Sequence, residues 1–282
     1  MRELDANVLV ETEYLGSNNS IVCTRDGLVL IDAPHRPTDA MRWRRIVQSC
    51  GDARYLINTD HHPDHTMCNC FLPGTIVSHR TTRRRLAANP PTRAYLDDLL
   101  ATIDPDGLRY MDSYHQRLPT LTYDTAMTLE LGGLTFELTH LPGHTPNNTL
   151  VYLKQQQIAF TGDLICEVGL PAFIEADVHA CLAATRHIEA MDIRYIVPGH
   201  GQVCGLPELR RFRGWIEDLM GEITQEIGRG ASRDQIVAEI AYPDRIHIAM
   251  GGSAGYPASL IDTFMKGSIA ALHDQIIARR AA

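Results

Sequence analysis

The sequence predicts an α/β protein in which two β-sheets pack face to face and helices cover both outer faces, a four-layer αββα sandwich. Two observations lead to this prediction. Strand patterns open the chain and return after residue 125, so each half supplies a sheet, and helical patterns separate the later strands. The 282 residues, 44% of them hydrophobic, suffice for a large core. Composition alone is equally compatible with other α/β folds.

The first part of the chain predicts antiparallel strands, a helix and then a buried strand. Residues 7–15 alternate as a strand does, and the strands 20–24 and 28–32 flank an Arg-Asp-Gly turn. Apolar residues at helical spacing between arginines predict a helix over 37–49. The strand 53–57 follows and leads directly into a histidine-rich stretch.

The segment 80–120 is the least regular part of the chain. A short strand at 75–78 precedes it, helices are predicted over 79–88 and 92–103, and a polar, aromatic stretch runs on to Pro119. We expect this region to be an insertion that lies over one face of the sheet and forms a wall of a substrate pocket.

The second half predicts another sheet followed by a helical tail. A Gly-Gly turn joins two strands into a hairpin, and a helix separates the last strand from the others. The predicted strands are 128–131, 134–138, 149–153, 158–160 and 195–197, and the predicted helix is 178–190.

We expect two parts in the chain, a sandwich domain over residues 1–205 and a helical C-terminal region over residues 206–282 packed on it. The tail helices predicted at 207–228 and 258–279 carry apolar stripes. These stripes most simply pack on the sandwich, although either helix could supply a homodimer face.

Composition and charge indicate which cellular compartment and which kinds of partner to expect. The formal charge of −8 argues against nucleic acid, which selects for a basic face. The start of the chain has no secretory signal pattern, and no apolar run is long enough to span a membrane. Seven cysteines, an odd number without framework spacing, suit a reducing compartment. We therefore expect a cytoplasmic protein that acts on a small molecule and binds neither nucleic acid nor membrane.

Ionisable side chains are densest just after the strand 53–57. Five of the six residues from Asp60 to His65 are aspartate or histidine. Side chains packed this closely at the end of a buried strand cannot all reach solvent or pair with one another. A metal ion is the simplest way to satisfy them, because it accepts lone pairs from imidazole and carboxylate at once.

Three later sites repeat this pattern. His144, Asp163 and His200 each follow a predicted strand, and glycine immediately precedes each of them. Glycine permits a tight backbone that turns the next side chain toward a shared centre. One such histidine alone is most often an ordinary core or surface residue, but four strand-end loops with matching chemistry predict one metal centre.

The motifs at these loops are His62-x-Asp64-His65, Leu141-Pro142-Gly143-His144-Thr145, Thr161-Gly162-Asp163 and Pro198-Gly199-His200-Gly201. Together and in this order they resemble the metal motifs of the metallo-β-lactamase fold superfamily, over roughly residues 8–205. The resemblance implies the αββα fold of that superfamily and a metallo-hydrolase of the zinc type.

The resemblance also implies a ligand set. One ion would be held by Asp64, His65 and His200, and Asp163 would bridge it to a second ion. The second ion would be held by His62, His144 and the residue at position 60. The family usually has histidine at this position, where this chain has Asp60.

The departure at Asp60 leaves three outcomes open. Asp60 binds metal directly and makes its site richer in oxygen, so that manganese or iron competes better with zinc. Alternatively it binds through a water, or its site is weak or empty and the enzyme holds one ion. His61 ranks below Asp60 as a ligand, because neighbouring side chains in an extended segment point in opposite directions.

The function favoured by this pattern is metal-dependent hydrolysis of an ester, lactone, thioester or amide of a small molecule. One or two zinc ions, with manganese or iron as alternatives, would generate a metal-bound hydroxide at neutral pH. Asp64 is the candidate catalytic residue, since it would hold that hydroxide or accept its proton. A tyrosine shortly after Asp163, typical of lactonases, is absent, and the only lysines, Lys154 and Lys266, adjoin no motif.

Other functions remain alternatives. The same centre could serve a hydrolytic dehalogenase of activated halo-aromatics. The carboxylate of Asp60 favours a further class, an iron-dependent enzyme of oxygen or sulfur oxidation on the same fold. A binding protein with a degenerate site is a third reading, against which the nearly complete ligand set argues.

Several polar residues outside the motifs are candidates for the pocket, and the sequence does not rank them. Cys68, Cys70, Cys166 and Cys204 also lie near motifs, and they are best explained as small buried apolar residues. The polar candidates are Asp32, Tyr95, Tyr114, His115, His140, His247 and Tyr256, and the glycine-rich segment 250–256 is either a loop near the site or a plain connection.

Overall fold

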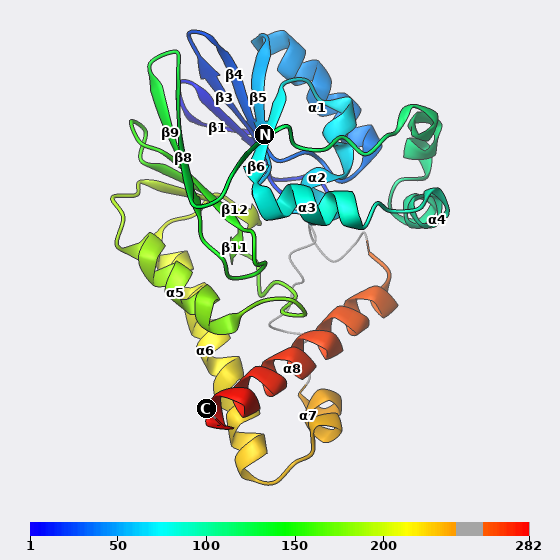
Figure 1. The fold of residues 1–282 in the computed structure, drawn as a ribbon, viewed down its shortest axis with the longest axis vertical. Helices are drawn as coiled ribbons and strands as arrows, with labels where there is room; N and C mark the ends of the chain where they lie inside the picture. Colours follow the sequence, from blue (N-terminus) through cyan, green and yellow to red (C-terminus); the bar gives the residue numbers. More distant parts are fainter. Residues whose placement is uncertain (241–255, 282) are drawn as a thin grey trace.

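The structure is a computed structural model that describes residues 1–240 and 256–281 (Figure 1). His247 and positions 250–255 of the glycine-rich segment lie outside the described residues. In the described part of the chain, no helix is both long and apolar enough to cross a membrane.

The N-terminal half forms a seven-stranded sheet whose strands lie side by side in chain order. Strands β1 to β4 are antiparallel, whereas β4 to β7 are parallel, with helices in the connections. The strands are β1 (Arg2–Asp5), β2 (Val8–Glu11), β3 (Asn19–Thr24), β4 (Gly27–Ile31), β5 (Ala53–Ile57), β6 (Thr75–His79) and β7 (Leu121–Tyr123).

The second half forms a five-stranded sheet in the order β12-β11-β10-β9-β8. Its hairpin connections are antiparallel, and β12 returns parallel to β11 after a helical crossover. The strands are β8 (Ala126–Leu131), β9 (Leu134–His140), β10 (Thr149–Leu153), β11 (Ile158–Cys166) and β12 (Tyr195–His200).

The two sheets pack against each other through apolar side chains from both. Val10, Val29 and Ile57 of the first sheet belong to the same buried cluster as Phe136 and Phe160 of the second. The alternation along each strand sends every other side chain to this inner layer. The opposite residues of the strands face the helices.

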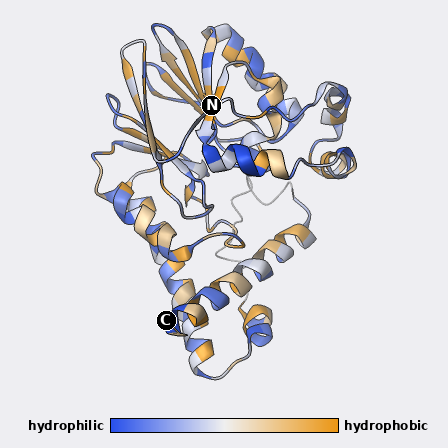
Figure 2. Ribbon diagram, viewed as in Figure 1, coloured by the Kyte–Doolittle hydropathy of each residue, from blue (hydrophilic) through white to orange (hydrophobic). Residues whose placement is uncertain are grey.

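Helices cover both outer faces. Trp43 and Val47 of α1 (Pro37–Cys50) pack on the outer face of the first sheet, as does the short 3-10 helix η1 (Met67–Phe71). On the second sheet lie α5 (Val178–Glu189) and α6 (Leu206–Gly228), and α8 (Ala258–Ala281) packs on α6. Hydrophilic and hydrophobic residues alternate along these three helices (Figure 2). The four-layer αββα sandwich with a helical C-terminal part is therefore confirmed.

The remaining helices belong to the connections between β5 and β7, except for α7, which packs on α6 and α8. They are α2 (Pro63–Thr66), α3 (Arg80–Ala88), α4 (Arg93–Ile103), the 3-10 helix η2 (Pro105–Ser113) and α7 (Arg233–Glu239). Leu96 and Leu100 of α4 pack with Met67, Met111 and Tyr256 in a separate apolar cluster. The segment 80–120 is thus mostly helical, and it contains the 3-10 helix η2 where a polar, aromatic stretch without helix was expected.

Two expectations about strands need correction. The short strands β1 and β7 were not predicted, and Asp163 lies inside β11 rather than in a loop after it. Strand β11 continues to Cys166, because residues beyond Phe160 still pair with β12, at Gly162 with Pro198 and at Cys166 with His200. The register shifts at Gly162, and this irregularity turns Asp163 toward the end of the sandwich.

Candidate metal centre

The seven predicted ligands converge at one end of the sandwich. Four come from the segment between β5 and η1, His144 comes from the β9–β10 connection, Asp163 from β11, and His200 ends β12. The rings of His65 and His200, far apart in the sequence, have centroids 5.8 Å apart. Segments from both sheets therefore meet at one centre.

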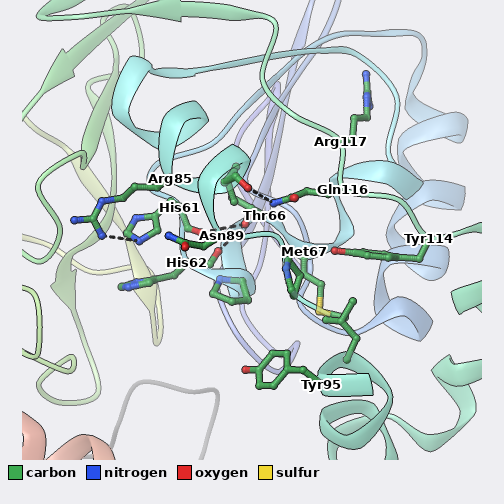
Figure 3. A pocket seen from close by; sticks show the side chains of 14 residues that line it. His61, His62, Thr66, Met67, Arg85, Asn89, Tyr95, Tyr114, Gln116 and Arg117 are labelled. Atoms are coloured by element: carbon green, nitrogen blue, oxygen red, sulfur yellow. Dashed lines mark hydrogen bonds between the residues drawn. The ribbon is translucent and has the colours of Figure 1, made fainter. Parts of the chain in front are cut away.

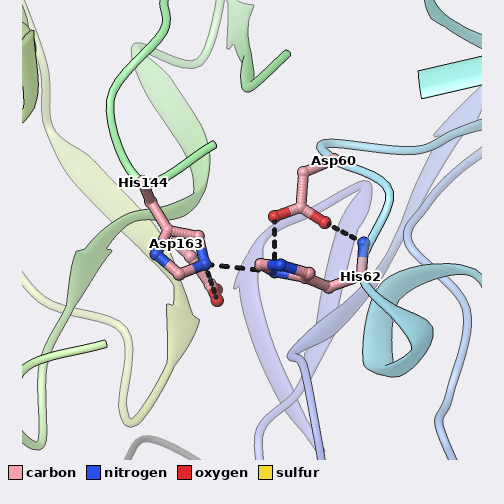
Figure 4. Close-up of side chains that lie close together, drawn as sticks. All are labelled: Asp60, His62, His144 and Asp163. Atoms are coloured by element: carbon pink, nitrogen blue, oxygen red, sulfur yellow. Dashed lines mark hydrogen bonds and ion pairs between the residues drawn. The ribbon is translucent and has the colours of Figure 1, made fainter. Parts of the chain in front are cut away.

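The first group contains Asp60, His62, His144 and Asp163, whose candidate ligand atoms all lie within 4.8 Å of one another. His144 Nε2 is 3.1 Å from His62 Nδ1 and 3.4 Å from Asp163 Oδ2. Asp60 Oδ2 is 3.4 Å from His62 Nδ1. Figure 4 shows these side chains pointing toward one another from opposite sheets.

The second group contains Asp64, His65 and His200, also within 4.8 Å of one another. His200 Nε2 is 3.2 Å from Asp64 Oδ2, and His65 Nε2 is 3.8 Å from the same oxygen. Asp163 Oδ1 lies 3.2 Å from the Nε2 atoms of both His65 and His200. Asp163 thus turns one carboxylate oxygen toward each group.

The donor set fits divalent cations. Asp60 Oδ2, His65 Nε2 and Asp163 Oδ1 are buried and have no hydrogen-bond partner, although other polar atoms lie close to them. A buried polar atom without a partner is costly, and a cation among these atoms would satisfy all three. Imidazole nitrogens with carboxylate oxygens suit zinc, and the oxygen of Asp60 shifts the first group toward manganese or iron.

Without a cation, histidines and carboxylates compensate one another. Burial by itself would lower the pKa of His200, but Asp163 and Asp64 raise it to about 9. Burial likewise opposes the charge of Asp60, but His65 and His62 lower the pKa of that carboxyl to about 2. The carboxylates are therefore ionised, and His200 holds a proton that a cation would displace.

Asp32 fixes the ring of His65 from behind. Its Oδ2 lies 2.8 Å from His65 Nδ1 and accepts a hydrogen bond from Thr59 Oγ1, while its Oδ1 accepts one from Thr59 N. Asp32 adopts a left-handed backbone with φ 56°, which is uncommon for a residue with a side chain. This arrangement leaves His65 Nε2 to face the centre.

Glu175 plays a similar part for His62, and sequence reasoning missed it. Glu175 Oε1 lies 2.8 Å from His62 Nε2 and 3.2 Å from His61 Nε2, and Arg85 forms an ion pair with the other oxygen. Burial would raise the pKa of Glu175, but hydrogen bonds from His61 and His62 hold it well below its usual value. His61 belongs to this cluster, the one with Glu175, and to neither ligand group.

Amide side chains hold the loops in place, and they carried no sequence signal. Asn18 Nδ2 donates to the carbonyls of Pro198 and Gly201, on either side of His200. Asn148 Oδ1 accepts a hydrogen bond from Thr145 N, next to His144. An asparagine that binds only backbone has no motif of its own, so only the folded chain reveals these contacts.

A cavity of about 380 Å³ lies over the centre. His62, Asp64, His144, Asp163 and His200 line its floor. Its walls contain His35, Pro63, Tyr95, Leu99, Pro171, Ala172, Ile174, Glu175, Tyr256, Leu260 and Phe264. A second cavity of about 340 Å³ shares His62, Pro63 and Tyr95 with the first. Figure 3 shows this second cavity, with Arg85 hydrogen-bonded to His61.

The other predicted pocket residues fall into two groups, those that line a cavity and those that do not. Tyr95 and Tyr256 line the cavity over the centre, and Tyr114 lines the second one. His115 is exposed, and His140 stacks on His79 with ring centroids 3.9 Å apart. In the described parts of the chain, no cysteine belongs to a candidate metal group, and Cys68 instead donates to the carbonyl of His35.

Comparison with known proteins identifies relatives of the sandwich. The model of the metallo-beta-lactamase superfamily matches residues 13–200. The hydroxyacylglutathione hydrolase GloC of Haemophilus influenzae is 31% identical over 87 residues, which are 29% of this chain and 41% of that protein. A beta-lactamase-like protein 2 homolog of Caenorhabditis elegans is 30% identical over 80 residues, which are 28% of this chain and 26% of that protein. The chain thus spans less than half the length of either curated relative.

Solved structures resemble the fold. A metallo-beta-lactamase from Pontibacter korlensis superposes with a TM-score of 0.62 at 20% identity, over 77% of this chain and 97% of that one. The stereoselective inverting sec-alkylsulfatase Pisa1 from Pseudomonas sp. superposes with a TM-score of 0.66 at 12% identity, over 97% of this chain and 49% of that one. The second alignment extends over the helical C-terminal part as well.

Proposed function

This chain belongs to the metallo-beta-lactamase superfamily, and we propose that it is a metal-dependent hydrolase that cleaves an ester, lactone, thioester or amide bond of a small molecule. The proposal includes two cation sites of unequal character. The group of Asp64, His65 and His200 takes zinc, whereas the group with Asp60 accepts manganese or iron more readily.

The carboxylate of Asp163 carries this proposal. Its two oxygens face the two groups, at 3.2 Å from His65 and His200 on one side and 3.4 Å from His144 on the other. A carboxylate in this position can bind one cation with each oxygen. The curated relatives carry hydrolase or lactamase-like names, which agrees with hydrolytic chemistry.

Cations bound here would supply Lewis-acid activation of water and of the scissile carbonyl at neutral pH. Asp64 faces the cavity with 16% of its side chain exposed, and it is the carboxylate best placed to accept the proton of the attacking water. Burial opposes its charge, but His65 and His200 hold the pKa of Asp64 well below its usual value. Asp64 is therefore ionised at neutral pH.

The remaining residues keep that carboxylate and the ligand atoms in position. Asp32 and Glu175 fix the rings of His65 and His62 from outside the centre. In the overall reaction water adds to the carbonyl carbon, and the bond from that carbon to the leaving oxygen, sulfur or nitrogen breaks. The proton that Asp64 receives then passes to the leaving group, so that an acid and an alcohol, thiol or amine are released.

Removal and return of metal tests the proposal. Dialysis against a chelator should abolish hydrolysis of 4-nitrophenyl acetate, and zinc or manganese should restore it. Asp163→Asn should lower metal content and hydrolysis together, because it removes the shared charge. Asp124→Asn, which alters an exposed carboxylate paired with Arg80, is the matched control and should change neither. Full activity of the metal-free protein would contradict the proposal.

A further inference from the structure

The cavity over the centre has a polar floor and an apolar wall. The metal-centre residues form its floor, and its wall contains Leu99 of α4, Ile174 of the segment after β11, and Leu260 and Phe264 of α8. Ile174 exposes 49% of its surface although it is aliphatic. Exposed apolar side chains that line a concave site mark a surface that binds apolar groups.

This wall is a fixed part of the fold. Ser268 Oγ of α8 accepts a hydrogen bond from Phe173 N at 2.8 Å, and Gln275 bonds both Ala176 O and Val178 N. These contacts join α8 to the segment that carries Ile174. Ile174 is thereby held in place beside the helix that carries Leu260 and Phe264.

The part of the wall that the structure describes offers no basic side chain. Among residues 1–240 and 256–281, those that line this cavity include no lysine or arginine. Lys154 and Lys266 form ion pairs elsewhere, with Glu137 and Asp262. A substrate carboxylate directed at this wall would lose water and gain no partner, which is costly. The described part of the wall therefore disfavours anionic side groups.

Two polar residues of this cavity, His35 and Tyr256, contact each other. The hydroxyl of Tyr256 lies 2.5 Å from His35 Nδ1, their rings stack with centroids 5.9 Å apart, and both residues line the cavity. Burial raises the pKa of Tyr256 well above its ordinary value, so the hydroxyl keeps its proton. Burial also lowers the pKa of His35 to about 4, so its ring is neutral at neutral pH.

A neutral ring can present either a hydrogen or a lone pair at Nδ1. When Nδ1 carries the hydrogen, it donates to the phenol oxygen, and the Tyr256 O–H is free to donate into the cavity. His35 thus fixes where the hydroxyl lies. A donor in this cavity, which the predicted ligands also line, can bind the carbonyl oxygen of a substrate.

We infer that the substrate is a neutral ester-like compound whose alkyl or aryl group lies against Leu99, Leu260 and Phe264, with its carbonyl oxygen bound by the hydroxyl of Tyr256. His35 is a positioning residue for this hydroxyl. The inference rests on the proposed hydrolase function, and it narrows the substrate class from any ester, lactone, thioester or amide to neutral apolar ones.

The test uses the metal-loaded protein and 4-nitrophenyl esters from acetate to hexanoate. Each added methylene should raise kcat/KM about fourfold until the wall is filled, which is the gain for burying one such group. The 4-nitrophenyl monoester of adipate, in which a carboxylate replaces the terminal methyl group of the hexanoate chain, should react at least about tenfold more slowly than the hexanoate. Phe264→Ala should flatten the dependence on chain length.

Variants of the polar pair test the second half of the inference. Tyr256→Phe should lower kcat about a hundredfold with little change in KM, because it removes a donor to the developing oxyanion. Tyr152→Phe, which removes the hydrogen bond of a distant tyrosine to Asp192 O, is the matched control and should leave kcat unchanged. His35→Asn keeps a polar atom near Nδ1 and should retain most of kcat, whereas His35→Leu should resemble Tyr256→Phe.

The outcomes separate this inference from the proposed function. Equal rates for the adipate and hexanoate esters, or an unchanged kcat in Tyr256→Phe, would overturn it while hydrolysis itself stands. If no ester is hydrolysed, the proposed function fails, and calorimetric binding of 4-nitrobenzyl alkyl ketones decides the inference. Affinity that rises about fourfold per methylene and falls about threefold or more in Tyr256→Phe would support it. Binding that depends on neither would overturn it.

Discussion

Asp60 is the residue at which this chain departs from its superfamily. Its two oxygens have different surroundings. Oδ1 accepts a hydrogen bond from His62 N at 2.8 Å, whereas Oδ2 is buried without a hydrogen-bond partner and lies 3.4 Å from His62 Nδ1. The first oxygen fixes the side chain and leaves the second to face the group. This geometry supports direct binding of a cation by Asp60 over the weaker alternatives, and the ligand assignment stays a prediction.

Substitution of Asp60 should change which metal the first group prefers. Asp60→His replaces an oxygen with a nitrogen donor, so zinc should gain on manganese by roughly tenfold or more in competition. His61→Asn is the control, because His61 lies with Glu175 outside the ligand groups, and it should leave the preference within a few-fold. Metal content after dialysis against mixed zinc and manganese measures both. Identical preferences in the native protein and Asp60→His would contradict direct binding.

At the scale of elements, the centre depends on close packing between the end of β5 and the bend in β11. Gly162 adopts φ +51°, and a Cβ there would lie 2.5 Å from Thr59 Oγ1. Thr59 in turn donates two hydrogen bonds to Asp32, which fixes His65. The glycine before Asp163 is thus required for its backbone conformation and for the space that Thr59 occupies.

Gly162→Ala should therefore cost more stability than a change of backbone preference alone. Gly230 also has a left-handed backbone, with φ +85°, but has nothing within 4 Å of a built Cβ. Gly230→Ala should lower the free energy of unfolding by about 1–2 kcal/mol, and Gly162→Ala should lower it further through contact with Thr59. Urea unfolding of the metal-free variants measures the difference. Equal losses would show that Thr59 moves aside freely.

The sequence predicted most elements of the sandwich, because their periodicity and turns are local signals. The strand 53–57, the Gly-Gly hairpin and the helix after Pro37 have nearly the predicted bounds. Strand β7 was not predicted, since a strand of three residues has too short a pattern to recognise. Strand β11 was predicted to end at Phe160, because the local sequence at Gly162 and Asp163 is typical of a loop. Pairing with β12 extends the strand past these two residues.

The site was predictable where its residues occur in motifs. The seven predicted ligands converge, whereas Glu175, Asn18 and His35 were missed because each acts through a partner distant in the chain. Tyr256 was one of several residues that the sequence predicted for the pocket without ranking them. Its contact with His35 is what distinguishes it from the other candidates. Contacts between elements such as these have no signature in a single sequence.

At the scale of the whole molecule, the centre joins the two sheets. Asp60, His62, Asp64 and His65 follow the first sheet, and the other predicted ligands belong to the second. In the metal-free protein, protonated imidazoles lie among the carboxylates. Burial would lower the pKa of His200, but Asp163 and Asp64 raise it to about 9. A cation that binds here must therefore displace protons.

Metal affinity should accordingly fall in acid. Below the pKa of His200, about 9, each displaced proton weakens the apparent affinity about tenfold per pH unit. Because this pKa is raised in the folded state, the proton stabilises the metal-free protein below about pH 6.5, and this contribution is lost as the pH rises through 9. Competition with a chelator at pH 6, 7 and 8 measures the affinity. An affinity that is independent of pH would contradict this view of the metal-free site.

The central claim is that Asp163 joins two cation sites built from both sheets. Anomalous diffraction from crystals of the zinc- or manganese-loaded protein tests it most directly. The account predicts two peaks, each about 2.0–2.2 Å from a different oxygen of Asp163. Metal-loaded crystals with no peak beside Asp163, or with the ion held by His61 and Glu175 instead, would contradict it.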